Sequence, residues 1–254
     1  MILIHRLTPL LIALAAAAGF ASVSFFGVPT LAGMGATFLA VALLGARLCR
    51  LNPRSFQFWY LVGTPTAFLA SSFGFLLLLE RPGERLALGI VSSLLLFLFY
   101  ELVFAYVHLP GAYQAYSIEH LSLALNVLTM FFLSAIAFGA GMLLQLPLWM
   151  LSAVFAGAAM FVVYGTLWVS KVTGRQALAY ALAGTALATE LFAVVTYLPT
   201  GYHTDAALMA VYLYVFLGLT RARFLDKLSG TVVRRYAITG VALVALIVGT
   251  ARWV

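Results

Sequence analysis

The sequence predicts an all-α protein whose helices form a polytopic transmembrane bundle of about nine spans. Three observations predict this class: 65% of the 254 residues are apolar, only 8% are charged, and the charges fall in short segments between long apolar runs. A soluble domain carries roughly 25% charged residues, so this chain has too few to cover a surface that faces water. A helix of about 20 apolar residues crosses the roughly 30 Å hydrocarbon core and satisfies its own backbone hydrogen bonds.

Nine apolar runs of membrane-crossing length follow one another along the chain. Pro53, Pro82, Pro110, Pro147 and Pro199 fall in or beside the connections, where helices are expected to stop or start. The connections are short, which is typical of neighbouring antiparallel helices. The predicted spans are 8–26, 30–48, 57–79, 86–107, 120–143, 147–169, 176–198, 205–223 and 236–253.

The first run has a second interpretation. Residues 1–21 resemble a signal peptide, with MILIHR before an apolar stretch and a small-residue cleavage site near Ala21. Cleavage would leave eight spans and would not change their orientation. The next apolar run begins almost at once, which favours a helical hairpin and nine spans.

The distribution of Lys and Arg predicts the orientation. With nine spans, eleven basic residues fall on the side of the N-terminus, and three (Arg81, Arg85 and Arg252) fall on the other side. Basic residues collect on the cytoplasmic side of membrane proteins, so we expect a cytoplasmic N-terminus and an outside C-terminus in a cell inner membrane. The densest basic group is expected to fix the topology and to attract anionic lipid headgroups or a partner protein. It consists of Arg221, Arg223, Lys227, Arg234 and Arg235.

Two distant segments share the pattern E-L-x5-[HY]-L-P-x2-Y. They are ELVFAYVHLPGAY at 101–113 and ELFAVVTYLPTGY at 190–202. Glu101 falls in the fourth span and Glu190 in the seventh, so the two copies cross the membrane in opposite directions. Each glutamate stands nine residues before a proline, about 13 Å along a helix, which predicts both carboxyls near the midplane. Secondary transporters commonly contain inverted repeats with midplane sites, although Leu-Pro and Tyr are also ordinary at membrane interfaces.

We expect the whole chain, 1–254, to be a single integral-membrane domain, because it has no long loop or low-complexity tract. An inverted repeat of spans 4–6 and 7–9 would subdivide it into an N-terminal three-helix unit, 1–85, a first repeat, 86–171, and a second repeat, 172–254.

Glu101 and Glu190 are candidate midplane carboxylates, either for a proton or an ion or for a structural hydrogen bond. A charge at the bilayer centre costs on the order of 2.5–3.5 kcal/mol, and the basic residues of the nine predicted spans fall only at span ends (Arg47, Arg221, Arg223 and Arg252), away from the centre. Each glutamate is therefore expected to be protonated, exposed to a watery cavity or bound to a cation. A carboxyl that is exposed to water alternately from the two sides of the membrane can carry protons. A carboxyl without access to water only forms hydrogen bonds between helices.

A polar seam is predicted at the inner ends of the fourth and fifth spans. Glu101 and His108 are seven residues apart and share a helix face, as do Glu119 and Asn126, and His120 lies beside them. Asn126 is expected to be the hydrogen-bond partner of Glu101. These side chains are of the types that bind metals, but their spacing matches no fixed metal motif, and an interfacial loop is the simpler interpretation.

A smaller polar group is predicted at the outer mouth, beneath Glu190. It consists of Tyr197, His203 and Asp205. These residues are expected to cap the interface, and Asp205 alone could be the N-cap of the eighth span.

The sequence lacks the residues that several known activities require. FAYVH at 104–108 matches a Phe-x3-His element of CAAX-protease-like membrane peptidases, but the Glu-Glu pair of those enzymes is missing. The chain has no nucleotide-binding loop and no Gly-x-Ser-x-Gly nucleophile elbow. Its single cysteine, Cys49, excludes an intramolecular disulfide and a cysteine metal cluster. We expect no cofactor and no nucleic acid, because topology accounts for the net charge of +7.

YQAYSIEHLSLALN, at 113–126, is similar to stretches of uncharacterised bacterial multi-spanning membrane proteins. The resemblance implies a bacterial inner membrane and brings no known activity.

Three functions remain open from the sequence. The first is a small secondary transporter or a proton- or ion-coupled permease that uses Glu101 and Glu190. The second is a non-catalytic structural or accessory subunit of a membrane complex, in which both glutamates tolerate replacement by glutamine. The third is a lipid-active membrane enzyme that uses His108, Glu119 and His120.

Overall fold

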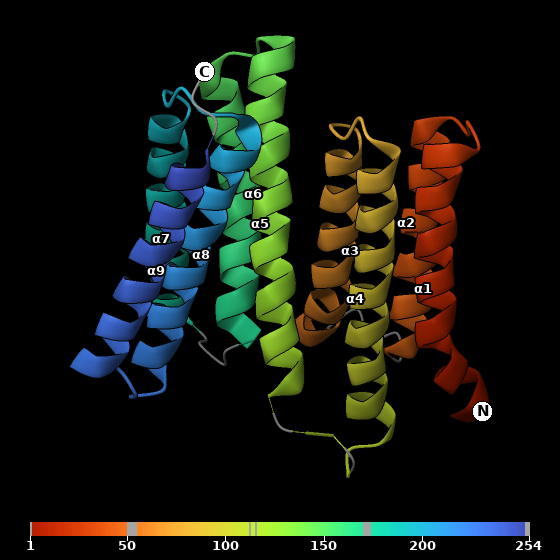
Figure 1. Cartoon of the computed structure of the whole chain (residues 1–254). Coiled ribbons are helices and arrows are strands. Elements are labelled where there is room, and N and C mark those ends of the chain that lie inside the picture. Colours follow the sequence, from red (N-terminus) through yellow and green to blue (C-terminus); the bar gives the residue numbers. More distant parts are fainter. Residues whose placement is uncertain (1, 50–54, 112, 115, 170–173, 252–254) are drawn as a thin grey trace. The chain divides into compact units, whose positions relative to one another are not determined.

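The computed structural model describes residues 2–49, 55–111, 113–114, 116–169 and 174–251. Over these residues the chain is all-helical and contains no strand (Figure 1), which confirms the predicted class. The helices are α1 Ile2–Phe25, α2 Thr30–Leu48, α3 Phe56–Leu76, α4 Pro82–His108, α5 Ser117–Leu144, α6 Leu148–Val169, α7 Arg175–Val195, α8 Tyr202–Phe224 and α9 Gly230–Thr250.

Eight of the helices in the described ranges are long and apolar enough to cross a membrane, so the chain is a multi-pass membrane protein. The exception is α3, which contains the buried Thr66, Ser71 and Ser72. The Thr66 hydroxyl donates to Val62 O at 2.8 Å, and the two serine hydroxyls donate to Phe68 O at 2.9 and 2.7 Å. The helix thus satisfies these hydroxyls with its own carbonyl groups.

Local signals explain where several helices begin. The side chain of Ser55 accepts a hydrogen bond from Phe58 N, and that of Ser229 accepts one from Val232 N, as N-caps do. Pro82 is the first residue of α4, where its missing N–H costs nothing. The first helix begins at Ile2, six residues before the predicted span, so it includes Arg6.

The chain divides into two compact units, Met1–Leu125 and Asn126–Val254. The boundary lies within α5. The predicted subdivision at 85/86 and 171/172 concerned an internal repeat, and that repeat stays a prediction.

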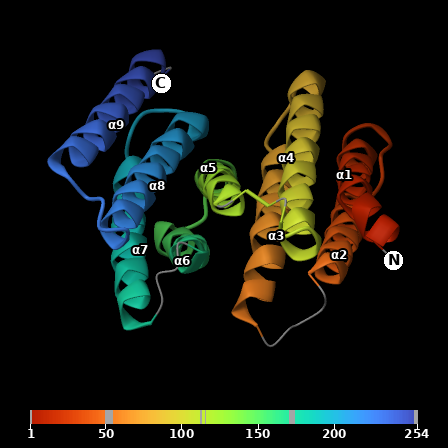
Figure 2. The same cartoon turned by 90° about the horizontal axis from the view of Figure 1, so that it is seen from below.

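In the first unit, α1 packs against α2 and α4, and α3 packs against the same two helices (Figure 2). Glycines allow the close approaches: a Cβ on Gly45 of α2 would lie 2.4 Å from the hydroxyl of Tyr100 on α4. Phe20 of α1 stacks on Phe73 of α3, with ring centroids 4.3 Å apart. Tyr100, Phe20 and Phe73 are all buried, so large aromatic side chains fill the centre of this unit.

In the second unit, α7 packs against α6 and α8, and α9 packs against α8. Phe192 of α7 lies between Phe138 of α5 and Phe155 of α6, with both ring centroids 4.5 Å away. On the neighbouring side, the Tyr212 hydroxyl of α8 donates to Gly184 O of α7 at 2.7 Å. The Phe192 contacts bring the C-terminal part of α7 close to α5 and α6, and the Tyr212 hydrogen bond joins the middles of α7 and α8.

The last helix is the most exposed element of the second unit. No residue of α9 is buried. Its attachment to α8 depends on Tyr236, because a Cβ on Gly218 would lie 2.3 Å from the Tyr236 ring. The rest of α9 presents Ile238, Val241 and Leu246 outward, as expected for a helix that faces lipid.

Candidate functional site

Asp205 is a buried carboxyl in the first turn of α8. The residue is only 1% exposed, although it lies within a turn of the helix start. The interpretation of Asp205 as an N-cap is wrong: the N-cap is Gly201, which forms no side-chain cap, and Asp205 follows four residues later. Its Oδ1 accepts a hydrogen bond from the hydroxyl of Thr200, which is also buried.

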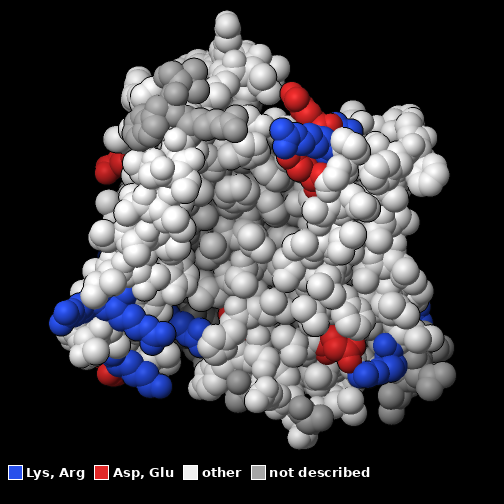
Figure 3. All heavy atoms as spheres, in the orientation of Figure 1, with Lys and Arg blue, Asp and Glu red and all other residues white. Residues whose placement is uncertain are grey.

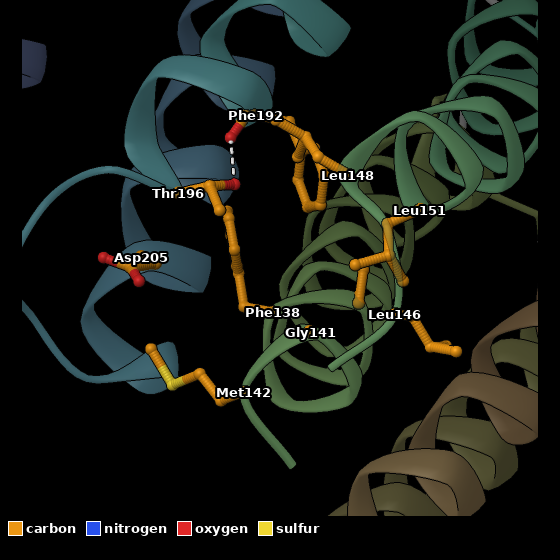
Figure 4. A pocket seen from close by; sticks show the side chains of 10 residues that line it. Phe138, Gly141, Met142, Leu146, Leu148, Leu151, Phe192, Thr196 and Asp205 are labelled. Carbon is orange, nitrogen blue, oxygen red and sulfur yellow. Dashed lines mark hydrogen bonds between the residues drawn. The ribbon is translucent and has the colours of Figure 1, made fainter. Parts of the chain in front are cut away.

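Asp205 lines a cavity of about 190 Å³ within the second unit (Figure 4). Thr196 and Asp205 supply its polar groups, and the Phe138 and Phe192 side chains supply aromatic walls. Small and aliphatic residues of α5, α6 and their connection form the remaining surface: Ala137, Gly141, Met142, Leu146, Leu148 and Leu151.

The polar side of the cavity has few charges. The hydroxyl of Thr196 donates to Phe192 O at 2.8 Å, so it is not free to donate a second hydrogen bond (Figure 4). Within the described part of the chain, the ion pairs are Arg6–Glu101 and Arg81–Glu84, and none involves Asp205. Asp205 is therefore the one charged residue among those that line the cavity, and its carboxyl is almost completely buried.

The three residues of the predicted outer mouth occupy different environments. Asp205 lines the cavity, whereas Tyr197 is 78% exposed and His203 is exposed. The His203 ring lies 4.1 Å from the ring of Tyr202. Sequence reasoning missed Thr196 and Thr200; the signal was the stretch TYLPTGYHTD at 196–205, where Thr200 stands five residues before the aspartate and Thr196 nine.

Glu101 has a cationic partner, contrary to the sequence-based expectation. Arg6 Nη1 lies 2.7 Å from Glu101 Oε1, and the two side chains are 56% and 30% exposed. The Arg6 guanidinium also lies 5.3 Å from the ring centroid of Phe104. The expectation failed because α1 begins before the predicted span and carries Arg6 alongside α4.

His108 shares the face of Glu101 on α4, as its spacing predicted. Its ring stacks on His5 of α1 at 4.8 Å and on Phe104 at 5.1 Å. The contact between α1 and α4 thus contains two imidazoles, one ion pair and one phenyl ring.

Glu190 is exposed on α7, near the end of that helix. Within the described residues it forms no ion pair. Its role as a midplane carboxylate stays a prediction.

Each of the other residues of the predicted seam has a hydrogen-bond partner that is not a member of the seam. The Tyr113 hydroxyl donates to Glu119 Oε2 at 3.4 Å, and Asn126 Nδ2 donates to Thr166 Oγ1 of α6 at 2.6 Å. The ring of His120 is exposed, and its Nδ1 lies 2.6 Å from Tyr116 O. Tyr113 precedes α5, and burial, with the adjacent Glu119 carboxylate adding to it, raises the pKa of its phenol.

The basic cluster lies where α8 meets α9. Arg223, Lys227, Arg234 and Arg235 are exposed, and Arg221 is half-buried. Blue atoms gather at this end of the second unit in Figure 3. Asp226 is the acidic residue in this connection, so the local charge is strongly positive.

Metal-binding groups are sparse: no cluster of three or more His, Cys, Asp or Glu occurs in the described ranges. No protein-family model, curated protein or solved structure matches the chain.

Proposed function

We propose that this protein is a small secondary transporter of the inner membrane that couples a solute to protons through Asp205. One observation carries the proposal: a carboxyl that is 1% exposed is among the residues that line a cavity at one end of a bundle of membrane-crossing helices, where α5 and α7 end and α6 and α8 begin. Ionisable groups within membrane spans are costly, and they commonly mark the paths of ions and substrates.

Asp205 is the group best placed for coupling. A proton and a cationic solute compete for the same carboxylate oxygens, so the release of one favours the binding of the other. Glu101, which is paired with Arg6, is the weaker candidate, since a cation must first displace the guanidinium.

The orientation belongs to the same proposal. The N-terminus lies in the cytoplasm and all nine helices cross, α3 included, because eleven of the fourteen Lys and Arg residues then fall on that side. The Asp205 end of α8 then faces outward, and the basic cluster at the other end of α8 contacts anionic lipid headgroups inside.

Purified protein in liposomes with a trapped pH dye tests this function. A panel of small cations, anions and neutral solutes is added outside. We expect at least one solute to change the internal pH with the wild-type chain and with Asp226→Asn, but not with Asp205→Asn. Asp226→Asn is the matched control, because Asp226 is exposed in the loop beyond the far end of α8. A solute response that persists in Asp205→Asn would contradict the proposal.

The exposed Glu190 favours a second candidate, an accessory subunit of a membrane complex. A carboxyl on an outward helix face is stabilised by a donor from a neighbouring protein. This function predicts that Glu190→Gln weakens co-purification of a membrane protein, whereas Asp205→Asn does not.

A further inference from the structure

We infer that the exposed face of α7 is a docking surface for α7 of a second copy of this chain, with Glu190 of one protomer hydrogen-bonded to the same residue of its partner. This inference goes beyond the proposed transport, which depends on Asp205.

The docking surface is the side of α7 that lies opposite its buried side. Ala179, Ala183, Ala186 and Glu190 are all exposed. At 3.6 residues per turn, their spacing places them within an arc of about 60°. The residues on the other side of the helix are buried: Ala177, Ala181, Gly184, Thr185, Ala188, Phe192 and Val195. The exposed stripe therefore consists of three alanines followed by one glutamate.

Larger apolar side chains border the stripe. Leu182 on one side is 56% exposed, and Leu187 on the other side is 49% exposed. The alanine side chains are much shorter than these leucines, so the backbone of another helix can approach closely along the stripe. Small residues at this spacing are typical of contacts between membrane helices.

Glu190 determines which partner the stripe can accept. It is the only acidic or basic residue of α7 after Arg175. Among the described residues, no ion pair involves Glu190. A carboxyl among exposed apolar side chains of a membrane-crossing helix is costly without a partner. A helix that covers the stripe must therefore bring a polar group to Glu190.

A second copy brings such a group to the matching position. All copies cross the membrane in the same direction, so a two-fold axis along the membrane normal places Glu190 opposite Glu190 at equal depth. A protonated carboxyl donates its O–H, and an ionised carboxyl accepts. Two carboxyls that share one proton therefore form a hydrogen bond without any basic residue. The alanine stripe is self-complementary for the same reason of symmetry.

Cysteine cross-linking tests where two copies meet. In a Cys49→Ala chain in liposomes, Ala186→Cys is compared with Val241→Cys on α9. Both positions are exposed and lie eleven residues after the start of a 21-residue helix, and both helices cross in the same direction. An oxidant should link Ala186→Cys chains at least about tenfold faster, because the interface gives their thiols a high effective concentration. Equal rates would overturn the inference.

Energy transfer between donor- and acceptor-labelled copies in liposomes tests the hydrogen bond. Glu190→Leu should lower the association constant about tenfold, because an interhelical hydrogen bond is lost. Glu190→Gln should keep most of the association, since an amide both donates and accepts. Unchanged association in Glu190→Leu would contradict the inference. An equal loss in both variants would also contradict it, because the surface would then need a basic partner from a different membrane protein.

A second pair of variants tests the close approach while keeping the carboxyl. Ala186→Leu fills the stripe and should lower the association constant as Glu190→Leu does. Ala245→Leu is the matched control, because Ala245 is exposed on α9, and it should leave association unchanged. Equal association of the two alanine variants would show that α7 is not the interface.

Discussion

At the scale of residues, Arg6 and Glu101 join the start of α1 to the last turns of α4. Their 2.7 Å ion pair is partly exposed, and the Arg6–Phe104 contact adds to it. Partly exposed pairs contribute about 1 kcal/mol or less. A double-mutant cycle with Arg6→Gln and Glu101→Gln should therefore give a coupling near 1 kcal/mol, measured by unfolding in detergent.

The exposed pair Arg81–Glu84 is the control for that cycle. Its N–O distance is 3.6 Å, and its side chains are 83% and 48% exposed. Pairs at this helical spacing contribute about 0.2–0.5 kcal/mol. A coupling for Arg6 and Glu101 no larger than this control would show that the two side chains do not hold α1 to α4.

Cys49 follows the last residue of α2, and its thiol should react slowly. Burial raises its pKa from 9.0 to about 12. Because the thiolate is the nucleophile, the reactive fraction at pH 8 falls from about 10⁻¹ to about 10⁻⁴. Maleimide labelling at pH 8 should be roughly 1,000-fold slower than for Gln114→Cys placed in a Cys49→Ala chain. Equal labelling rates would refute the burial of this thiol.

Residue pairs were the hardest features to predict from the sequence. The spacing of Glu101 and His108 correctly predicted a shared helix face. It could not predict Arg6 or His5 opposite them, because those contacts depend on how α1 packs on α4. Asp205 was identified as a candidate, but the cavity that it lines depends on packing between four helices, α5 to α8.

At the scale of elements, the contact between α2 and α4 depends on a missing side chain. A Cβ on Gly45 would lie 2.4 Å from the Tyr100 hydroxyl and 2.8 Å from a ring carbon. Gly45→Ala should therefore destabilise the protein by about 1–3 kcal/mol, as measured by thermal unfolding in detergent. Gly35→Ala on the same helix meets nothing within 4 Å and should be neutral or slightly stabilising. Similar losses in both variants would rule out the proposed close packing.

The connection between α8 and α9 should bind anionic lipid. Arg235 is exposed beside other basic residues, whereas Arg81 lies near Glu80 and Glu84. Phosphatidylglycerol should stabilise the protein relative to phosphatidylcholine, by about 1 kcal/mol per basic residue. Arg235→Gln should remove part of that difference, and Arg81→Gln should not. The unfolding midpoint in nanodiscs of the two lipids measures the effect, and an equal response of the two variants would count against it.

Helix positions were predictable because each apolar run was long and was bounded by proline or charge. The predicted span 30–48 coincides with α2, but α4 and α5 extend past their predicted spans. The predicted lengths were set by the thickness of the hydrocarbon core. A helix can extend past that thickness, because it ends only where its terminal backbone groups find other partners. Helix α3 also contains polar residues, whose hydroxyls bond within the helix.

At the scale of the whole molecule, two compact units meet within α5, and the candidate site lies in the second unit. The sequence pattern E-L-x5-[HY]-L-P, which occurs at 101–113 and again at 190–202, drew attention to Glu190 and to the segment before Asp205. It could not predict that Glu190 is exposed or that Asp205 is buried, because the sequence pattern does not reveal which face of a helix is covered by its neighbours.

The central claim is that Asp205 couples the movement of a small cation to protons. The most direct test is the accumulation of radiolabelled tetramethylammonium in liposomes that contain the protein and have an acidic interior. This cation has no N–H proton to lose, so it cannot cross as a neutral amine. The account predicts accumulation by the wild type and by Asp226→Asn, collapse of that accumulation when nigericin removes the pH gradient, and no accumulation by Asp205→Asn. Equal uptake by wild type, Asp205→Asn and protein-free liposomes would contradict it.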